Sequence, residues 1–294
     1  MQSQEEERDG QAATEAMNAE VLATVGHELR SPLTSIKGYT ATLLRQERRL
    51  SRQERQEFLL AIREASERLE AIIERFLEMS QLETGNLKAR PIPVDAARVA
   101  QEALLNAQQR TNESLPAHFT FHLRLKDEHG ALTSQEPLIL ADPRLLREVL
   151  DNLLDNAINY SPDGGRIDIV IYPVQSSSAG RQYAAQEMVS REERREGQMQ
   201  TEGEAEQMLD ICVCDHGLGI PDEHLERIFE RFHRVDTGLT RTVNGLGLGL
   251  TICKRIVEMH GGRIWAESCS AGGSAFHVLF PLAEKSEVSD VHEI

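Results

Sequence analysis

The chain has 294 residues, of which 40% are hydrophobic and 27% are charged, the composition of a globular protein with a sizeable core. At about 100–200 residues per domain, this length predicts two domains. The formal net charge of −16 argues against a general nucleic-acid binder or a polybasic membrane anchor. No apolar run approaches the roughly 18 residues that a membrane span needs. Four cysteines without a C-x-x-C spacing indicate reduced thiols in a cytoplasmic chain.

Three polar segments carry much of the acidic excess: residues 1–14, 175–208 and 283–294. The segment 175–208 is rich in Ser, Gln, Glu and Arg, and its few apolar residues follow no period. This composition predicts a disordered or loosely helical insert. The two terminal segments are predicted to be disordered tails. The remaining chain then divides into a domain at 15–88 and a domain at 89–282.

The first of these domains shows a helical pattern. Apolar or ring residues recur at alternating steps of three and four from Leu22 to Leu43, and again from Phe58 to Met79. Such steps form the heptad seam of packed helices, so the sequence predicts an antiparallel helical hairpin. One hairpin buries two seams poorly, whereas two hairpins form a four-helix bundle, which predicts a homodimer. The alternative is a monomeric hairpin packed on the rest of the chain.

The pattern changes after Leu87. Phe119–Leu125 alternates apolar and polar residues, as a half-buried strand does. Asp142 followed by Pro143 is a helix start, and the helix is expected to run to about residue 159. Further strands are predicted at 167–171, 209–213, 262–267 and 274–280, and a further helix at 248–260. The expected fold class is an α/β sandwich with helices on one face of a sheet.

His27 lies at a position that the heptad exposes. With Leu22 at position a and Val25 at position d, His27 falls at f, opposite the seam. An exposed imidazole is largely neutral near pH 7 and can act as a nucleophile. Glu28 can orient the ring or accept its proton, and the hydroxyl of Ser31 lies on the same helical face. On position alone, a surface histidine without a role is the simpler interpretation.

The helix that begins at Pro143 carries a polar stripe. Glu148, Asn152 and Asn156 are spaced four residues apart. One carboxylate and two amide oxygens in line suit a hard cation such as Mg²⁺. An exposed polar face explains the stripe equally well when it is taken alone.

Asp215 ends an apolar strand and is followed by Gly217 and Gly219. Its carboxylate can accept a hydrogen bond from an exocyclic amine such as that of adenine. The glycines allow the backbone to approach a ligand closely.

A second glycine motif opens the predicted helix at 248–260. Backbone amides at a glycine-rich helix start can hold phosphate. The spacing does not fit the dinucleotide fingerprint, because the sixth position is Leu250 or Ile252, and the chain has no P-loop motif. The three glycines are Gly245, Gly247 and Gly249.

In this order, the motifs resemble the catalytic core of the sensor histidine kinases of two-component signalling. The similarity covers residues 15–282. The segments that carry it are the phospho-acceptor H box at 26–34, the N box at 152–157, the first glycine box at 215–220, the F box at 228–234, the second glycine box at 245–250 and the third at 272–276.

The resemblance implies a helical dimerisation and phosphotransfer domain followed by a Bergerat-type ATP-binding domain. It implies that His27 attacks the γ-phosphate of Mg-ATP, and that Asn156, with Asn152 nearby, holds Mg²⁺. It also implies that Asp215 reads adenine, that Arg234 contacts the γ-phosphate and that the second glycine box closes over the phosphates. The phosphoryl group would pass to an aspartate of a response regulator. One departure is Asn159, which stands where the family usually has a basic residue.

Two alternative functions remain open at this point. The chain could act mainly as a phosphatase on its regulator, with Glu28 and Ser31 placing a water. It could instead be a dimeric scaffold that binds nucleotide without transfer. The sequence leaves no room for a sensor, so the signal is expected from an upstream sensor domain or protein, and the chain is expected to work in the cytoplasm. The signal, the regulator and cis or trans transfer are not encoded in any motif.

Overall fold

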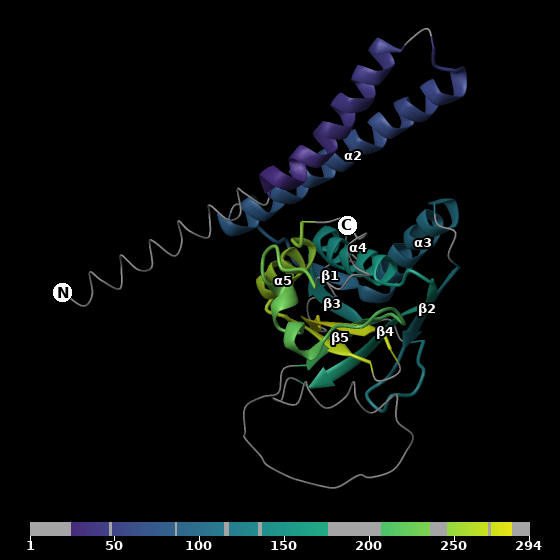
Figure 1. Cartoon of the computed structure of the whole chain (residues 1–294). Coiled ribbons are helices and arrows are strands. Elements are labelled where there is room, and N and C mark those ends of the chain that lie inside the picture. The colour runs from purple at the N-terminus through teal and green to yellow at the C-terminus, as the bar shows by residue number, and fades with distance from the viewer. Residues whose placement is uncertain are drawn as a thin grey trace, which may run out of the picture. The chain divides into compact units, whose positions relative to one another are not determined.

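The computed structural model describes residues 25–46, 49–85, 87–114, 118–134, 137–175, 207–235, 246–269 and 272–283. The chain divides into two units (Figure 1). The first consists of residues 1–86, with the described helices of the hairpin, and residues 244–249, and the second is an α/β unit of residues 87–243 and 250–294. The predicted tail at 1–14, residues 284–294, residues 176–206 of the predicted insert, and Gly245 lie outside the described residues.

The helical unit is a hairpin of two helices. Residues 25–45 are helical, and after a short connection α2 (Arg52–Glu83) follows. Ser51 caps α2: its hydroxyl accepts from the Glu54 amide at 3.2 Å, and its own amide donates to the Glu54 carboxylate at 2.8 Å. Tyr39 stacks on Phe58 with ring centroids 5.5 Å apart, which joins the two helices.

The predicted heptad seam forms the inner face of this hairpin. Val25, Pro32, Ile72 and Met79 are buried, and the other described seam residues are half-buried. A second set of large apolar side chains in the same unit is exposed, as one isolated hairpin would leave it. These residues are Leu33, Leu44, Leu59, Leu60, Ile73 and Leu77.

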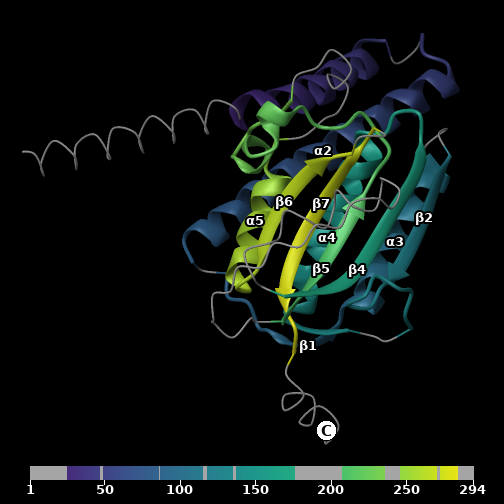
Figure 2. The ribbon, with the colours of Figure 1, turned by 90° about the horizontal axis from the view of Figure 1, so that it is seen from below.

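The α/β unit contains a five-stranded sheet with the order β2-β4-β5-β7-β6 (Figure 2). β2 and β4 are parallel, and the other neighbours are antiparallel. A separate antiparallel pair joins β1 (Ile92–Asp95) to β3 (Leu138–Ala141). The strands of the large sheet are β2 (Phe119–Leu125), β4 (Gly165–Gln175), β5 (Gln207–Cys214), β6 (Arg263–Ser268) and β7 (Ser274–Pro281).

Three helices cover one face of this sheet, as Figures 1 and 2 show, which confirms the predicted fold class. They are α3 (Ala96–Ser114), α4 (Pro143–Asn159) and α5 (Gly249–Met259). α4 buries seven apolar side chains against the sheet and its neighbours. α3 carries a stripe of fully buried alanines, which lets its backbone approach α4 and β2 closely. The alanines are Ala96, Ala100, Ala103 and Ala107.

The start of α4 is tied to the end of α5 through His260. Asp142 caps α4 by accepting from the Arg144 amide at 3.0 Å. The Asp142 amide in turn donates to Nε2 of the buried His260 at 3.0 Å, and Nδ1 of His260 lies 2.7 Å from the Ile256 carbonyl. Because Nε2 must accept, Nδ1 carries the proton. The imidazole therefore satisfies one donor and one acceptor inside the core.

Replacement of His260 by leucine is expected to lower the free energy of unfolding by about 1–3 kcal/mol, since a buried amide loses its acceptor. Urea unfolding followed by circular dichroism measures this change. His129→Leu is the matched control, because His129 is exposed in the turn after β2 and should change stability by less than about 0.5 kcal/mol. Equal stability of the two variants would contradict the role of His260.

Candidate active site

The phospho-acceptor candidate lies on the described part of the first helix. His27 and Ser31 are exposed, Glu28 is half-buried, and the seam residues Val25 and Pro32 on the other side of the helix are buried. The imidazole of His27 is thus open to solvent. Glu28 and Ser31 are within one helical turn of it, on the same stretch of helix.

The polar stripe lies on α4 as the spacing requires. Glu148, Asn152 and Asn156 are half-buried, whereas Asn159 is exposed at the end of the helix. The side-chain amide of Asn152 donates to the Glu148 carbonyl at 3.1 Å. This bond uses an amide hydrogen, so the Asn152 side-chain oxygen takes no part in it.

Asp215 is held firmly at the end of β5. The residue is 3% exposed, and its Oδ1 accepts from the amides of Gly217 at 2.8 Å and Ser274 at 3.2 Å. Its own amide donates to the Ser274 carbonyl at 2.9 Å. Burial raises the pKa of Asp215 above its usual value, although these amide donors oppose the shift. Both of these amide bonds end on Oδ1, and the Ser274 side chain also hydrogen-bonds the carboxylate.

The glycines of the first and third boxes fit against protein backbone. A Cβ at Gly217 would lie 2.2 Å from the Tyr160 carbonyl oxygen, and one at Gly273 would lie 2.1 Å from the Asp215 carbonyl oxygen. Gly219 has φ +73°, which favours glycine. The sequence suggested that Gly217 and Gly219 allow close approach of a ligand. The structure gives both a further reason, since they let the loop that follows Asp215 pack on its neighbours.

The F box is anchored to α5. Ile228 and Phe229 of the short 3₁₀ helix η3 (Arg227–Phe229) are buried. The hydroxyl of Thr251 in α5 donates to the Phe229 carbonyl at 3.1 Å. Arg234, predicted to contact the γ-phosphate, is exposed at the end of this described segment.

The second glycine box leads directly into α5. Gly245 lies outside the described residues, Gly247 has φ +67°, and Gly249 is the first residue of α5. The flanking Leu246 and Leu248 are buried. The backbone amides at the start of α5 have no intrahelical acceptors.

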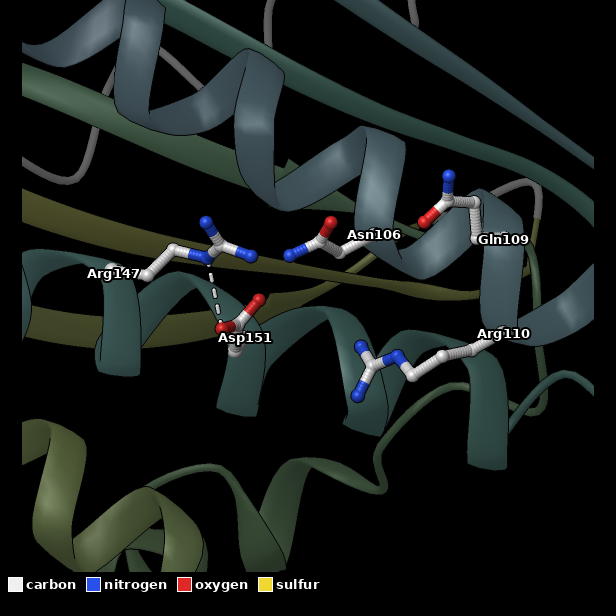
Figure 3. A pocket seen from close by; sticks show the side chains of 5 residues that line it. All are labelled: Asn106, Gln109, Arg110, Arg147 and Asp151. Carbon is white, nitrogen blue, oxygen red and sulfur yellow. Dashed lines mark hydrogen bonds and ion pairs between the residues drawn. The ribbon is translucent and has the colours of Figure 1, made fainter.

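A pocket of about 280 Å³ lies between α3 and α4 (Figure 3). Arg147 and Asp151 line it from α4 and pair at 2.9 Å, and Arg110 of α3 pairs with Asp155 at 2.9 Å. Arg147, Asp151 and Asp155 each come directly before a residue of the polar stripe. Their side chains therefore point about 100° away from the stripe around α4. The pocket is therefore separate from the predicted nucleotide site. Asn106 and Gln109 complete its lining.

The sequence did not identify several residues that shape the site. Tyr160 accepts from the Leu218 amide at 3.0 Å, and the Ser268 hydroxyl lies 3.2 Å from the Ile220 amide, so both hold the first glycine box. Ser274 and Thr251 supply the bonds described above. Tyr160 could have been suspected from its place directly after α4, whereas Ser268 is 48 residues from its partner and has no local signal.

The described residues contain no group of three or more His, Cys, Asp or Glu side chains that could hold a metal ion. Across the same part of the chain, every helix is too short or too polar to cross a membrane.

Comparison with known families assigns both units. Residues 17–85 match the His Kinase A (phospho-acceptor) domain, and residues 141–284 match the histidine kinase-, DNA gyrase B- and HSP90-like ATPase family. The chain therefore carries the catalytic core of a sensor histidine kinase, as the sequence motifs predicted.

Individual relatives agree with this assignment. The circadian input-output histidine kinase CikA of Synechococcus elongatus is 31% identical over 276 residues, which is 93% of this chain and 31% of the relative. The sensor histidine kinase WalK of Bacillus subtilis is 28% identical over 268 residues, 91% of this chain and 37% of the relative. The chain thus spans about a third of the length of these curated relatives.

A solved structure shows the same fold. The histidine kinase AdeS of Acinetobacter baumannii superposes with a TM-score of 0.55 at 19% identity, covering 88% of this chain and 98% of that one.

Proposed function

We propose that this chain is an ATP-dependent protein-histidine autokinase that phosphorylates His27 and passes the phosphoryl group to an aspartate of a response regulator. The observation that carries the proposal is the exposure of His27 on a helix whose opposite side is buried. A buried histidine could not reach a phosphoryl donor, whereas this imidazole can present a ring nitrogen to the γ-phosphate.

The ATPase family match supports ATP as the donor, and the residues of the α/β unit fit it. Oδ2 of Asp215 can accept from the adenine amine, while the bonds to Oδ1 keep the carboxylate in place. The amides at the start of α5 can donate to phosphate oxygens. Positioning of this kind, with neutralisation of charge, accounts for most of the catalysis of phosphoryl transfer.

The donor set on α4 fits Mg²⁺ that arrives with the nucleotide. Mg²⁺ keeps several waters and takes one or two protein ligands plus phosphates, so it needs no protein cage. The described residues offer no such cage, but Asn152 and Asn156 lie on one side of α4, and the bond from Asn152 to the Glu148 carbonyl does not use the Asn152 side-chain oxygen. Bound there, the ion would neutralise phosphate charge. Asn156 would be its main protein ligand.

Asn156→Ala is expected to weaken Mg-ATP binding about tenfold or more, since a contact to a charged group contributes about 1.5–3 kcal/mol. Titration calorimetry with and without Mg²⁺ measures the change, and the loss should appear only with Mg²⁺ present. Asn159→Ala is the matched control because Asn159 is exposed on the same helix. An unchanged affinity of the Asn156 variant would argue against its role as a ligand.

The partners follow from the same domains. The dimerisation and phosphotransfer domain, with its exposed apolar side chains Leu33, Leu59, Ile73 and Leu77, supports a homodimer. A receiver domain is the expected acceptor, and an upstream sensor domain or protein is the expected source of the signal. The cytoplasm is the expected site of action, since ATP and free thiols are both maintained there.

A phosphatase activity on the regulator is a second candidate, favoured by the exposed hydroxyl of Ser31 one turn after His27. Hydrolysis of a phospho-aspartate needs an aligned water, which is a positioning task. Ser31→Ala should therefore slow loss of label from a phosphorylated receiver domain about tenfold or more, with labelling of His27 nearly unchanged. Ser31→Thr keeps the hydroxyl and should keep both rates. A proportional fall of both rates would show that Ser31 has no separate hydrolytic role.

The proposed kinase activity is tested by incubating the purified chain with γ-labelled ATP and Mg²⁺. Label should enter the protein and should then move to a purified receiver domain. Nucleotide binding without any labelling would favour the dimeric scaffold instead.

A further inference from the structure

The sheet carries a polar cluster on the face that the three helices leave uncovered. Side chains alternate along β5, so Leu209, Ile211 and Val213 enter the core on the helix side. Asp210, Cys212 and Cys214 therefore point to the opposite face. On the neighbouring β7, His277 is paired with Cys212.

These side chains are joined in a chain of close contacts. The Cys212 and Cys214 sulfurs are 3.2 Å apart, and the Cys212 sulfur is 3.5 Å from Nε2 of His277. Nδ1 of His277 lies 2.9 Å from Oδ2 of Asp210, and the Tyr172 hydroxyl donates to the same oxygen at 2.7 Å. Two thiols, an imidazole and a carboxylate that orients it thus form one connected cluster, in which each group contacts the next.

The cluster is protected but reachable at one end. Asp210 and His277 are each 2% exposed, and the ring of Trp265 stacks on His277 with centroids 4.7 Å apart. Cys212 is buried, whereas Cys214 is half-buried and is the last residue of β5. Cys214 is therefore the less protected of the two cysteines.

The two thiols differ in acidity. The hydrogen bond between the two sulfurs lowers the pKa of Cys214 despite its burial, while that same bond and burial raise the pKa of Cys212. Burial lowers the pKa of His277, but the hydrogen bond to Asp210 outweighs it and raises the value. Because Cys214 is also the less buried of the two and ends β5, we assign it as the attacking thiol.

We propose that Cys212 and Cys214 form a peroxide-sensitive thiol pair, with Cys214 as the attacking sulfur, Cys212 as the resolving thiol and His277 as the proton relay. The Cys214 thiolate attacks a hydroperoxide, its sulfur takes one oxygen and an alcohol or water leaves. The Cys212 sulfur then attacks that sulfenic acid. Its proton passes through His277 to the departing hydroxide, which leaves as water. Two thiols and one hydroperoxide give one disulfide, one alcohol or water, and one water.

Formation of the Cys212–Cys214 disulfide should displace Asp215. The effect of this shift on nucleotide binding rests on the proposed function. The sulfurs must move from 3.2 Å to about 2.05 Å, which pulls on the end of β5. Asp215 follows Cys214 directly and is held by Ser274 and Gly217. We expect nucleotide binding about 5- to 10-fold weaker in the oxidised chain.

The test treats the reduced full chain with a slight excess of hydrogen peroxide and measures its intact mass. The wild type should lose the mass of two hydrogen atoms and regain it with dithiothreitol. Cys214→Ser should lose none. Cys212→Ser should instead gain one oxygen at Cys214 and react with dimedone. Cys214→Ala and Cys212→Ala repeat the test with apolar side chains.

Cys269→Ser is the matched control. Cys269 is also half-buried, and burial raises its pKa to about 11, so it should not replace Cys214 as the attacking thiol. The proposed thiol pair is contradicted if the wild type keeps both thiols or if Cys269→Ser abolishes disulfide formation. Binding of a fluorescent ATP analogue to the reduced and the oxidised chain then measures the effect of disulfide formation on nucleotide affinity. Equal affinity of the reduced and oxidised wild type would overturn the link to Asp215, whereas failure of the reduced chain to bind would contradict the proposed function instead.

Discussion

Replacement of His27 by glutamine is expected to reduce phosphoryl labelling from ATP to background while nucleotide affinity stays unchanged. The glutamine amide is not a nucleophile, so the γ-phosphate has no acceptor. Glutamine is also a good helix former, so the exposed site on the first helix should keep its structure. Labelling with γ-labelled ATP and titration of the same preparations with an ATP analogue separate the two effects.

His129→Gln is the matched control for this variant. His129 is exposed in the turn after β2, and the same substitution there should leave labelling unchanged. Label in the His27 variant equal to that of the wild type would mean that another residue accepts the phosphoryl group.

Asp215→Asn is expected to weaken nucleotide binding about 10- to 100-fold. The asparagine oxygen can still accept from the Gly217 and Ser274 amides, so the loop should keep its place. Its NH₂ group would then face the adenine amine, and two donors would oppose each other. Titration with ATP and with GTP measures the effect, and the loss should be larger for ATP.

The control for Asp215 is Asp163→Asn, because Asp163 is an exposed residue of the turn after α4. This variant should bind ATP as the wild type does. Unchanged ATP affinity in the Asp215 variant would show that the carboxylate serves only to hold the glycine box.

Elements with a strong local signal could be predicted from the sequence. The Asp-Pro start and apolar stripe placed α4 at Pro143–Asn159, and alternation placed β2 at Phe119–Leu125, as the structure has them. The heptad steps also identified the inner face of the hairpin. In each case large apolar residues mark the buried positions, so their period can be read from the sequence.

Other elements lacked such a signal. α3 was not predicted, because its buried stripe consists of alanines rather than large apolar residues. β1 and β3 are four residues each and are stabilised by pairing with each other across more than 40 residues. Short strands of this kind depend on tertiary contacts that no local window contains.

The site shows the same division. The order of the motifs predicted His27, Asn156 and Asp215 as site residues, but the packing of Gly217 on Tyr160 and of Gly273 on Asp215 arises only when the chain folds. The contact between Cys212 and His277 likewise joins residues 65 positions apart on adjacent strands. Alternation along a single strand predicts the face of a side chain, whereas register between strands decides its neighbours.

The most direct measurement of the central claim is the chemical nature and position of the phosphoryl linkage. The purified chain is labelled with γ-labelled ATP and Mg²⁺, and the product is divided between acid and base before peptide mapping by mass spectrometry. A phosphohistidine should lose its label in acid, keep it in base and map to the peptide that contains His27. Label that survives acid, or that maps to any other residue, would contradict the assignment of this chain as a histidine autokinase.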